Sequence, residues 1–207
     1  MLQATRVFFI RHADCDINVY AGARSNPPLS EVGKKQVEAL SFWAKNADID
    51  KVYSSPLVRA MDTAKGIAMA KGLEVNPIDA LKELDFGEWE GLSASDIPAE
   101  ERERWYHEPL TTAPPGGETL TELAKRVLSA YRDITDSNVG KNIAIVAHGG
   151  PLRTIICSIL GLHLSFLWNF ELAHASVSAA DIYPNGYSLL VFLNNTYFRE
   201  GFFDKKG

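Results

Sequence analysis

Two stretches of the sequence end in the same way, Val7-Phe8-Phe9-Ile10-Arg11-His12 and Ile143-Ala144-Ile145-Val146-Ala147-His148. Each is a short apolar run, rich in β-branched or aromatic residues, that is typical of a buried strand. In an open parallel sheet, ligands bind beyond the carboxyl ends of the strands. We therefore expect His12 and His148 to lie at one edge of a sheet, at the position where such sheets carry out chemistry.

Amphipathic segments alternate with the strands. Helical patterns or helix-start signals are present at residues 30–45, after 55, at 119–134 and at 151–160. Further strands are expected at residues 51–53, 177–183 and 187–193, and the last two flank a Pro-Asn-Gly turn that is typical of a hairpin. Alternating strands and helices favour an α/β fold. The prediction is a three-layer αβα sandwich with a mostly parallel central sheet and an antiparallel edge strand.

The least regular stretch is the proline-rich segment from about residue 83 to 117. Trp89, Trp105 and Tyr106 give this segment enough apolar mass to dock on the rest of the protein. We interpret it as an insertion over the active site rather than as a linker between domains. The prediction is thus one domain over residues 1–207, a length that suits a single sizeable core.

Composition excludes several classes of protein. The chain carries 21 Lys and Arg against 26 Asp and Glu, a net charge of -5, so a broad nucleic-acid surface is not expected. Cys15 and Cys157 lie far apart and provide neither a disulfide framework nor zinc-ligand spacing, which favours a reducing, cytoplasmic setting. No apolar run approaches the length needed to cross a bilayer, and no membrane partner is expected.

The residues at the strand ends suit the handling of phosphate. Arg11 and Arg59 can make bidentate, charge-assisted contacts to phosphate oxygens, and a neutral imidazole is a competent nucleophile. The glycines after His148 open a helix whose free N–H groups can face an anion. Taken singly, each histidine could be a buried structural side chain and Arg59 a surface ion pair. Taken together, the residues indicate a site that holds a phosphate and attacks it.

Six segments, in order along nearly the whole chain, resemble the signatures of the histidine phosphatase superfamily, also called phosphoglycerate mutase-like. No single motif is specific, but the ordered set is. The matching segments are Arg11-His12-Ala13-Asp14-Cys15 with Asn18, Pro28-Leu29-Ser30-Glu31-Val32-Gly33 with Gln36, Ser54-Ser55-Pro56-Leu57-Val58-Arg59, Glu83 with Leu84-Asp85-Phe86-Gly87-Glu88-Trp89-Glu90-Gly91, Gly116-Gly117-Glu118-Thr119, and Val146-Ala147-His148-Gly149-Gly150.

The resemblance implies a two-step phosphoryl transfer through phosphohistidine. His12 would attack phosphorus in line. The phosphate oxygens would be held by Arg11, Asn18, Arg59, His148 and the Gly149 N–H. Such catalysis rests on positioning and electrostatic stabilisation. Neither a metal nor another cofactor is expected, because the guanidinium groups and a protonated His148 would supply the positive charge.

The resemblance also places a proton donor at Glu83. This carboxyl group would protonate the leaving alkoxide and then take a proton from water, which near neutral pH requires a raised pKa and a partly desolvated site. Glu88 and Glu90 are nearby rivals. Of the other histidines, His174 could point at the site, but a structural place is the main interpretation for it.

Two residues depart from the family pattern. Ala13 replaces a glycine, and its methyl group would crowd the backbone if the position required a positive φ. Cys15 replaces a hydroxyl residue and is interpreted as a small buried filler. Neither change removes a reactive group, so the resemblance still implies an active enzyme.

Several functions are compatible with these residues. The first is a phosphomonoesterase, and the segments around Phe86 and Leu167 resemble α-ribazole phosphatases of cobalamin synthesis. Trp89, Trp105, Tyr106 and Trp168 could cover the nucleoside-like substrate of such an enzyme, although most aromatic residues of this kind belong to the core. The alternatives are a broad-specificity phosphatase, a phosphoglycerate mutase, and a non-catalytic phosphate-binding module. The expected partner is a small phosphorylated substrate, and a homodimer is possible by analogy with the family.

Overall fold

The computed structural model describes residues 3–199, so both ends of the predicted 1–207 domain lie outside the described residues. The strands are β1 (Thr5–Arg11), β2 (Lys51–Ser54), β3 (Val75–Pro77), β4 (Asn142–Ala147), β5 (Val177–Ile182) and β6 (Ser188–Asn195). The α-helices are α1 (Glu31–Asn46), α2 (Val58–Lys71), α3 (Ala99–His107), α4 (Leu120–Asp136) and α5 (Gly149–Leu160). Short 3₁₀ turns complete the chain: η1 (Asp79–Leu81), η2 (Gly87–Trp89), η3 (Leu164–Phe166) and η4 (Tyr197–Arg199).

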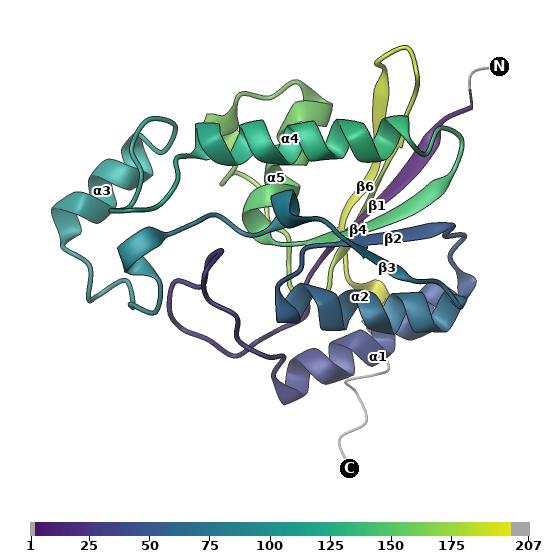
Figure 1. The fold of residues 1–207 in the computed structure, drawn as a ribbon, viewed down its shortest axis with the longest axis horizontal. Coiled ribbons are helices and arrows are strands. Elements are labelled where there is room, and N and C mark those ends of the chain that lie inside the picture. Colours follow the sequence, from purple (N-terminus) through teal and green to yellow (C-terminus); the bar gives the residue numbers. More distant parts are fainter. Residues whose placement is uncertain (1–2, 200–207) are drawn as a thin grey trace.

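The strands form one mixed sheet in the order β3-β2-β4-β1-β5-β6 (Figure 1). β3, β2, β4 and β1 are mutually parallel, whereas β5 runs antiparallel to both β1 and β6. The predicted α/β fold and the predicted hairpin are confirmed. Of the two hairpin strands, the inner one, β5, runs in the direction opposite to the parallel strands.

Alternating side chains of the central strands build two cores. On β1, Val7 and Phe9 pack in the core beneath α4 and α5, whereas Phe8 and Ile10 pack in the core beneath α1 and α2. Successive side chains of a strand point to opposite faces, so an almost wholly apolar strand must be covered on both sides. Helices accordingly lie on both faces of the sheet, as Figure 1 shows.

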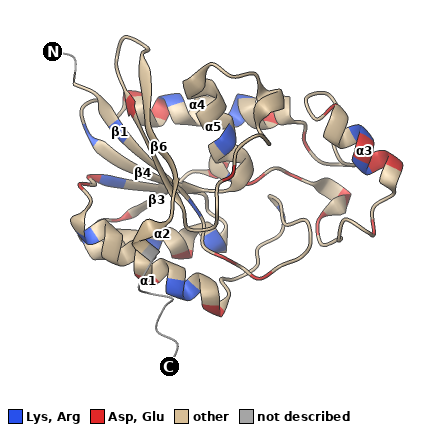
Figure 2. Ribbon diagram, turned by 180° about the vertical axis from the view of Figure 1, so that it is seen from behind, with Lys and Arg blue, Asp and Glu red and all other residues tan. Residues whose placement is uncertain are grey.

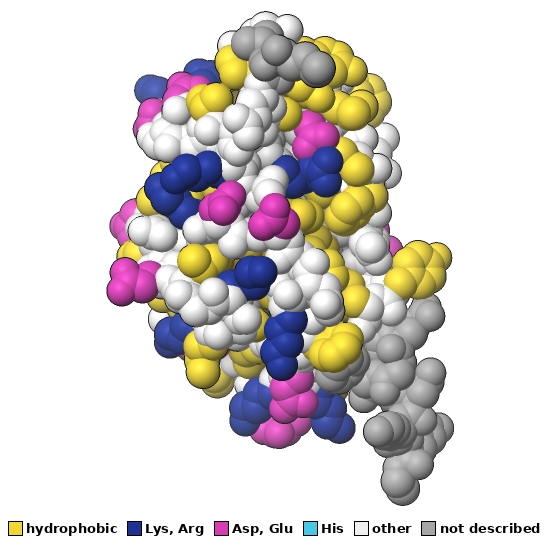
Figure 3. All heavy atoms as spheres, turned by 90° about the vertical axis from the view of Figure 1, so that its right-hand side faces the viewer, with side chains coloured by type: hydrophobic (Ala, Val, Ile, Leu, Met, Phe, Trp, Pro, Cys, Tyr) yellow, Lys and Arg dark blue, Asp and Glu magenta, His cyan; other side chains and the backbone are white. Residues whose placement is uncertain are grey.

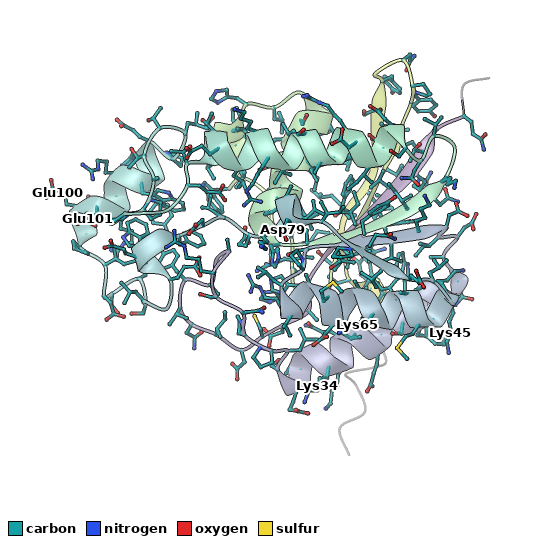
Figure 4. All side chains as sticks on the ribbon, in the orientation of Figure 1. Lys34, Lys45, Lys65, Asp79, Glu100 and Glu101 are labelled. Atoms are coloured by element: carbon teal, nitrogen blue, oxygen red, sulfur yellow. The ribbon has the colours of Figure 1, made fainter. Side chains whose placement is uncertain are left out.

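The opposite ends of the parallel strands differ in chemistry. Figure 3 views the face at the amino ends, where lysines, arginines and acidic residues are interspersed and no histidine is visible. Other exposed charges lie on the outer helices: Figure 4 labels Lys34, Lys45 and Lys65 on α1 and α2. The histidines of interest follow the carboxyl ends instead, directly after β1 and β4.

Residues 83–117 pack around an aromatic cluster of their own. Trp105 and Trp89 are almost completely buried, with ring centroids 5.8 Å apart, and Tyr20 packs against Trp89 from the loop after β1. Helix α3 lies to one side of the sheet in Figure 2 and carries acidic residues, of which Figure 4 labels Glu100 and Glu101. The insertion thus contacts the rest of the protein through the loop that follows β1.

No α-helix within residues 3–199 combines the length and the hydropathy that a membrane span requires.

Candidate active site

A pocket of about 170 Å³ opens at the carboxyl ends of the parallel strands. Its floor and walls come mainly from the loop after β1, with further residues from α2, from the segment that begins at residue 83 and from the segment before β5. The lining residues are Arg11, His12, Asp14, Cys15, Asp16, Ile17, Val19, Ala21, Arg59, Glu83 and His174.

His12 is fixed by its own backbone and by a neighbouring carbonyl. Its N–H donates to the Ala147 carbonyl on β4 over 2.9 Å, and its Nδ1 lies 2.7 Å from the Ala13 carbonyl oxygen. A carbonyl only accepts hydrogen bonds, so Nδ1 carries the proton. The neutral ring then has its lone pair on Nε2, which is the atom available for attack.

Both central histidines are held neutral. Burial, reinforced by the charges of Arg11 and Arg59, lowers the pKa of His12 well below its usual value of 6.5. Burial likewise lowers the pKa of His148, with further contributions from His12 and Arg59. The lowered pKa of His148 argues against the protonated imidazole expected from the sequence and leaves the guanidinium groups as the source of positive charge.

The imidazole of His148 lies next to that of His12. Its ring centroid is 5.0 Å from that of His12, and its Nε2 is 2.8 Å from Ser55 Oγ, which follows β2. Its buried Nδ1 has no hydrogen-bond partner in the described part of the chain. His148 is also the N-cap residue of α5, so Gly149 opens the helix and its N–H lies in the first, unsatisfied turn.

Arg59 is almost completely buried, which is rare for a charged side chain. Its guanidinium donates to the carbonyls of Ser25, Gly22 and Ala21 over 2.8, 3.0 and 3.3 Å. Burial lowers the pKa of this group, but arginine remains a cation in proteins. Backbone oxygens thus hold the charge on one side, while the same side chain lines the pocket on the other.

The structure separates the three candidate carboxylates. Glu83 lines the pocket, and its Oε1 accepts hydrogen bonds from Leu84 N and from Gly150 N at the start of α5. Glu90 instead accepts from the backbone N–H groups of Arg24 and Ser25 and supports the loop that surrounds Arg59. Glu88 is exposed and is not among the pocket residues.

Arg126, on α4, holds the segment that carries Glu83. It donates to the carbonyls of Ala80, Lys82 and Glu83 over 2.7, 2.8 and 2.8 Å, and its Nε donates to Glu118 over 3.0 Å. Glu118 in turn accepts from the backbone N–H of Asp85. The backbone before and after Glu83 is therefore fixed by hydrogen bonds.

Three of the predicted phosphate ligands, Asn18, His148 and Gly149, are not among the residues that line the pocket. Asn18 is exposed and lines a separate shallow hollow with Val19, Tyr20, Ala94 and Tyr106. His12, Arg11, Arg59 and Glu83 line the pocket itself. His148 and Gly149 lie buried behind them, at the junction of β4 and α5.

The unusual residues of the first motif fit without strain. Ala13 is buried, donates its N–H to Thr63 Oγ1 and does not adopt a positive φ, so its methyl group does not crowd the backbone. Cys15 is buried, as its interpretation as a filler requires, and it also lines the pocket.

Sequence reasoning gave too little weight to His174, which lines the pocket with its ring centroid 5.1 Å from that of His12. A signal was available. Because the hairpin makes β5 antiparallel to β1, the residues just before β5 lie at the same sheet edge as those just after β1. His174 precedes β5 by three positions.

Histidine and arginine side chains at the carboxyl ends of parallel strands are an arrangement that suits the binding of phosphate. Residues 7–196 match the model of the histidine phosphatase superfamily (branch 1), and the chain belongs to that superfamily. It is 35% identical to phosphoserine phosphatase 1 of Hydrogenobacter thermophilus over 179 residues, 84% of each chain.

Two further similarities extend over most of the chain. The chain is 36% identical to the bifunctional protein Rv2228c of Mycobacterium tuberculosis over 93% of its own length, and spans only 54% of that relative. The structure of the alpha-ribazole phosphatase from Shigella flexneri superposes with a TM-score of 0.83 at 29% identity, covering 92% of this chain and 96% of that one.

The neutral histidines predict how stability depends on pH. The unfolded chain takes up protons near pH 6.5, whereas buried His12 and His148 resist protonation, so stability is greatest above this pH and falls as pH drops below it. Each histidine contributes a slope of up to about 1.4 kcal/mol per pH unit. Urea unfolding of the wild type and of His148→Asn at several pH values measures how the free energy of unfolding depends on pH. The slope should be smaller in His148→Asn, and an unchanged slope would contradict a neutral, buried His148.

Proposed function

We propose that this protein is a metal-independent phosphomonoesterase that acts through a phosphohistidine on His12. The observation that carries the proposal is the Nδ1–H of His12 bonded to the Ala13 carbonyl, which leaves Nε2 as a neutral nucleophile in a pocket lined by Arg11 and Arg59. Within residues 3–199, no cluster of His, Cys, Asp or Glu has the geometry to hold a metal ion. The two guanidinium groups would neutralise the phosphate.

The chemistry would proceed in two displacements. In the first, His12 Nε2 bonds to phosphorus as the ester P–O bond breaks, and the carboxylic acid of Glu83 protonates the leaving alkoxide. In the second, water attacks the phosphohistidine, the Glu83 carboxylate accepts its proton, and inorganic phosphate leaves. Arg11 and Arg59 would hold the equatorial oxygens in both steps.

We propose α-ribazole 5′-phosphate as the substrate. The likeness to the Shigella enzyme supports this proposal, and so does a second cavity of about 520 Å³ that shares residues 14–17 with the pocket and is lined by Pro27, Pro28 and Leu29. A bulky, largely apolar alcohol would find room there. Of the four aromatic residues expected to cover the substrate, Trp89 and Trp105 are buried, whereas Tyr106 and Trp168 are exposed.

Phosphoserine is the second candidate. It is favoured by the 35% identity to a phosphoserine phosphatase and by the small volume and charged lining of the pocket around His12. The cytoplasmic setting and the homodimer expected from the sequence are also proposals. The alternatives are a phosphoglycerate mutase and a non-catalytic phosphate-binding module, and the following assay separates them from a phosphatase.

Substrate choice is tested by phosphate release from α-ribazole 5′-phosphate, phosphoserine and 3-phosphoglycerate. We expect the highest kcat/KM on α-ribazole 5′-phosphate and rapid phosphate release without added bisphosphoglycerate. The His12→Ala variant should release no phosphate from any of the three substrates. Higher kcat/KM on phosphoserine would transfer the assignment to the second candidate. Isomerisation of 3-phosphoglycerate faster than its hydrolysis would indicate a mutase, and binding without turnover would indicate a non-catalytic module.

The role of Glu83 is tested by leaving-group dependence. An alkyl alcohol needs a proton in order to leave, whereas nitrophenolate hardly does, so Glu83→Gln should slow single-turnover cleavage of an alkyl phosphate by about 10²–10⁴-fold and that of nitrophenyl phosphate far less. The exposed neighbour provides the matched control, Glu88→Gln, which should leave both rates unchanged. Equal losses on both esters would show that the acid lies elsewhere.

A further inference from the structure

The segment before β5 encloses the catalytic end of β1. The Ala175 N–H donates to the carbonyls of both Arg11 and His12 over 3.1 Å, and the Arg11 N–H donates to the Ser176 carbonyl. Ala175 does this at a φ of +54°, a conformation that a non-glycine residue adopts only at a cost. Such strain persists where surrounding contacts impose it. The residue next to it, His174, faces the pocket.

The contacts of His174 define its protonation state. An Nη2–H of Arg11 lies 2.8 Å from His174 Nε2, and Nη1 of the same guanidinium donates to the Leu172 carbonyl over 2.6 Å. Because guanidinium can only donate, Nε2 must be the acceptor. The remaining ring nitrogen, Nδ1, then carries the proton and lies 3.4 Å from Asp14 Oδ1.

Asp14 is itself held by the start of α1. Its Oδ2 accepts from Ser30 Oγ over 2.5 Å, its carbonyl accepts from the Ser30 N–H, and its own N–H donates to Gln36 Oε1. A carboxylate anchored in this way favours the tautomer of His174 with Nδ1–H. Contacts therefore run from the start of α1 to Asp14, from Asp14 to His174, and from His174 to Arg11.

We propose that His174 is a positioning residue that orients Arg11 toward the phosphate, and that Asp14 selects the tautomer that can do so. This inference rests on the proposed phosphatase function and assigns a residue to it that sequence alone did not. Two acceptors, Nε2 of His174 and the Leu172 carbonyl, fix the guanidinium plane. Each Nη nitrogen retains a second N–H for an anion, so the fork is oriented before the substrate arrives.

Protonation of His174 would undo this arrangement. A protonated Nε2 cannot accept from Arg11, and two donors would then face each other across the contact. Within residues 3–199, the charged or titratable groups that line the pocket together with His174 are Arg11, His12, Asp14, Cys15, Asp16, Arg59 and Glu83. Arg11 and Asp14 contact the ring nitrogens, so acid should weaken phosphate binding through loss of the Arg11 contact.

The direct test is calorimetric titration of inorganic phosphate into the wild type, His174→Ala and His174→Gln. The glutamine carbonyl can reach the place of Nε2 and accept from Arg11, but it does not titrate. We expect phosphate affinity to fall about tenfold or more in the alanine variant and to recover in the glutamine variant. His107→Ala, an exposed histidine in the insertion, is the matched control and should bind as the wild type does.

Repeating the phosphate titrations from about pH 8 to about pH 5.5 shows whether His174 positions Arg11 or only stabilises the fold. The ratio of wild-type to glutamine-variant affinity cancels the titration of phosphate itself and of groups that do not interact with His174. We expect this ratio to fall with pH, because only the wild type loses its acceptor. A constant ratio, or alanine and glutamine variants that bind equally well, would overturn the inference.

The outcome also distinguishes this inference from the proposed function. If the wild type binds phosphate and turns over esters while His174→Ala binds phosphate equally tightly, only the role of His174 fails. If the wild type binds no phosphate at all, the proposed function fails, and the inference fails with it.

Discussion

The parallel pairing of β1 with β4 is the constraint on which the site depends. Arg11 pairs with Ala147 in register, and the His12 N–H extends the ladder by one further bond to the Ala147 carbonyl. This bond brings the residues that follow both strands, His12 and His148, to within 5.0 Å of each other. A slip of one residue would turn every side chain of β1 to the other face and would exchange Val7 and Phe9 for Phe8 and Ile10 in two cores that are each packed around their own pair.

The same packing determines the electrostatics. His12, His148 and Arg59 are almost completely buried and Arg11 is partly buried, and both guanidinium groups donate to backbone carbonyls that stabilise their charge. Their positive charge and the burial then keep His12 and His148 neutral. The arrangement suits transfer of a phosphoryl group, since a neutral nucleophile stands beside fixed cations that require little reorganisation when an anion enters.

Much of this site follows from sequence, because strand ends, helix caps and glycine turns are local signals. Ser30 and Thr119 cap their helices as predicted, and Glu83 lines the pocket from the motif position assigned to it. Long-range placement is harder to predict. Asn18 lies in a loop whose course is set by contacts with the insertion, including the bond from the Tyr20 N–H to the Leu92 carbonyl. His174 reaches the site only because β5 is antiparallel, and the burial of Trp105 within its own cluster depends on tertiary packing.

The central claim is that His12 Nε2 carries the phosphoryl group between substrate and water, and rapid quenching during turnover tests it most directly. The account predicts a covalent phosphate that is labile in acid and stable in base, found by mass spectrometry on the peptide that contains His12. With nitrophenyl phosphate, whose first step depends little on the acid, its amount should approach one phosphate per chain in Glu83→Gln, because this variant slows the hydrolytic step. A phosphate found on Cys15 or Ser55 would contradict the account. Turnover without any covalent phosphate, in the wild type and in Glu83→Gln alike, would contradict it as well.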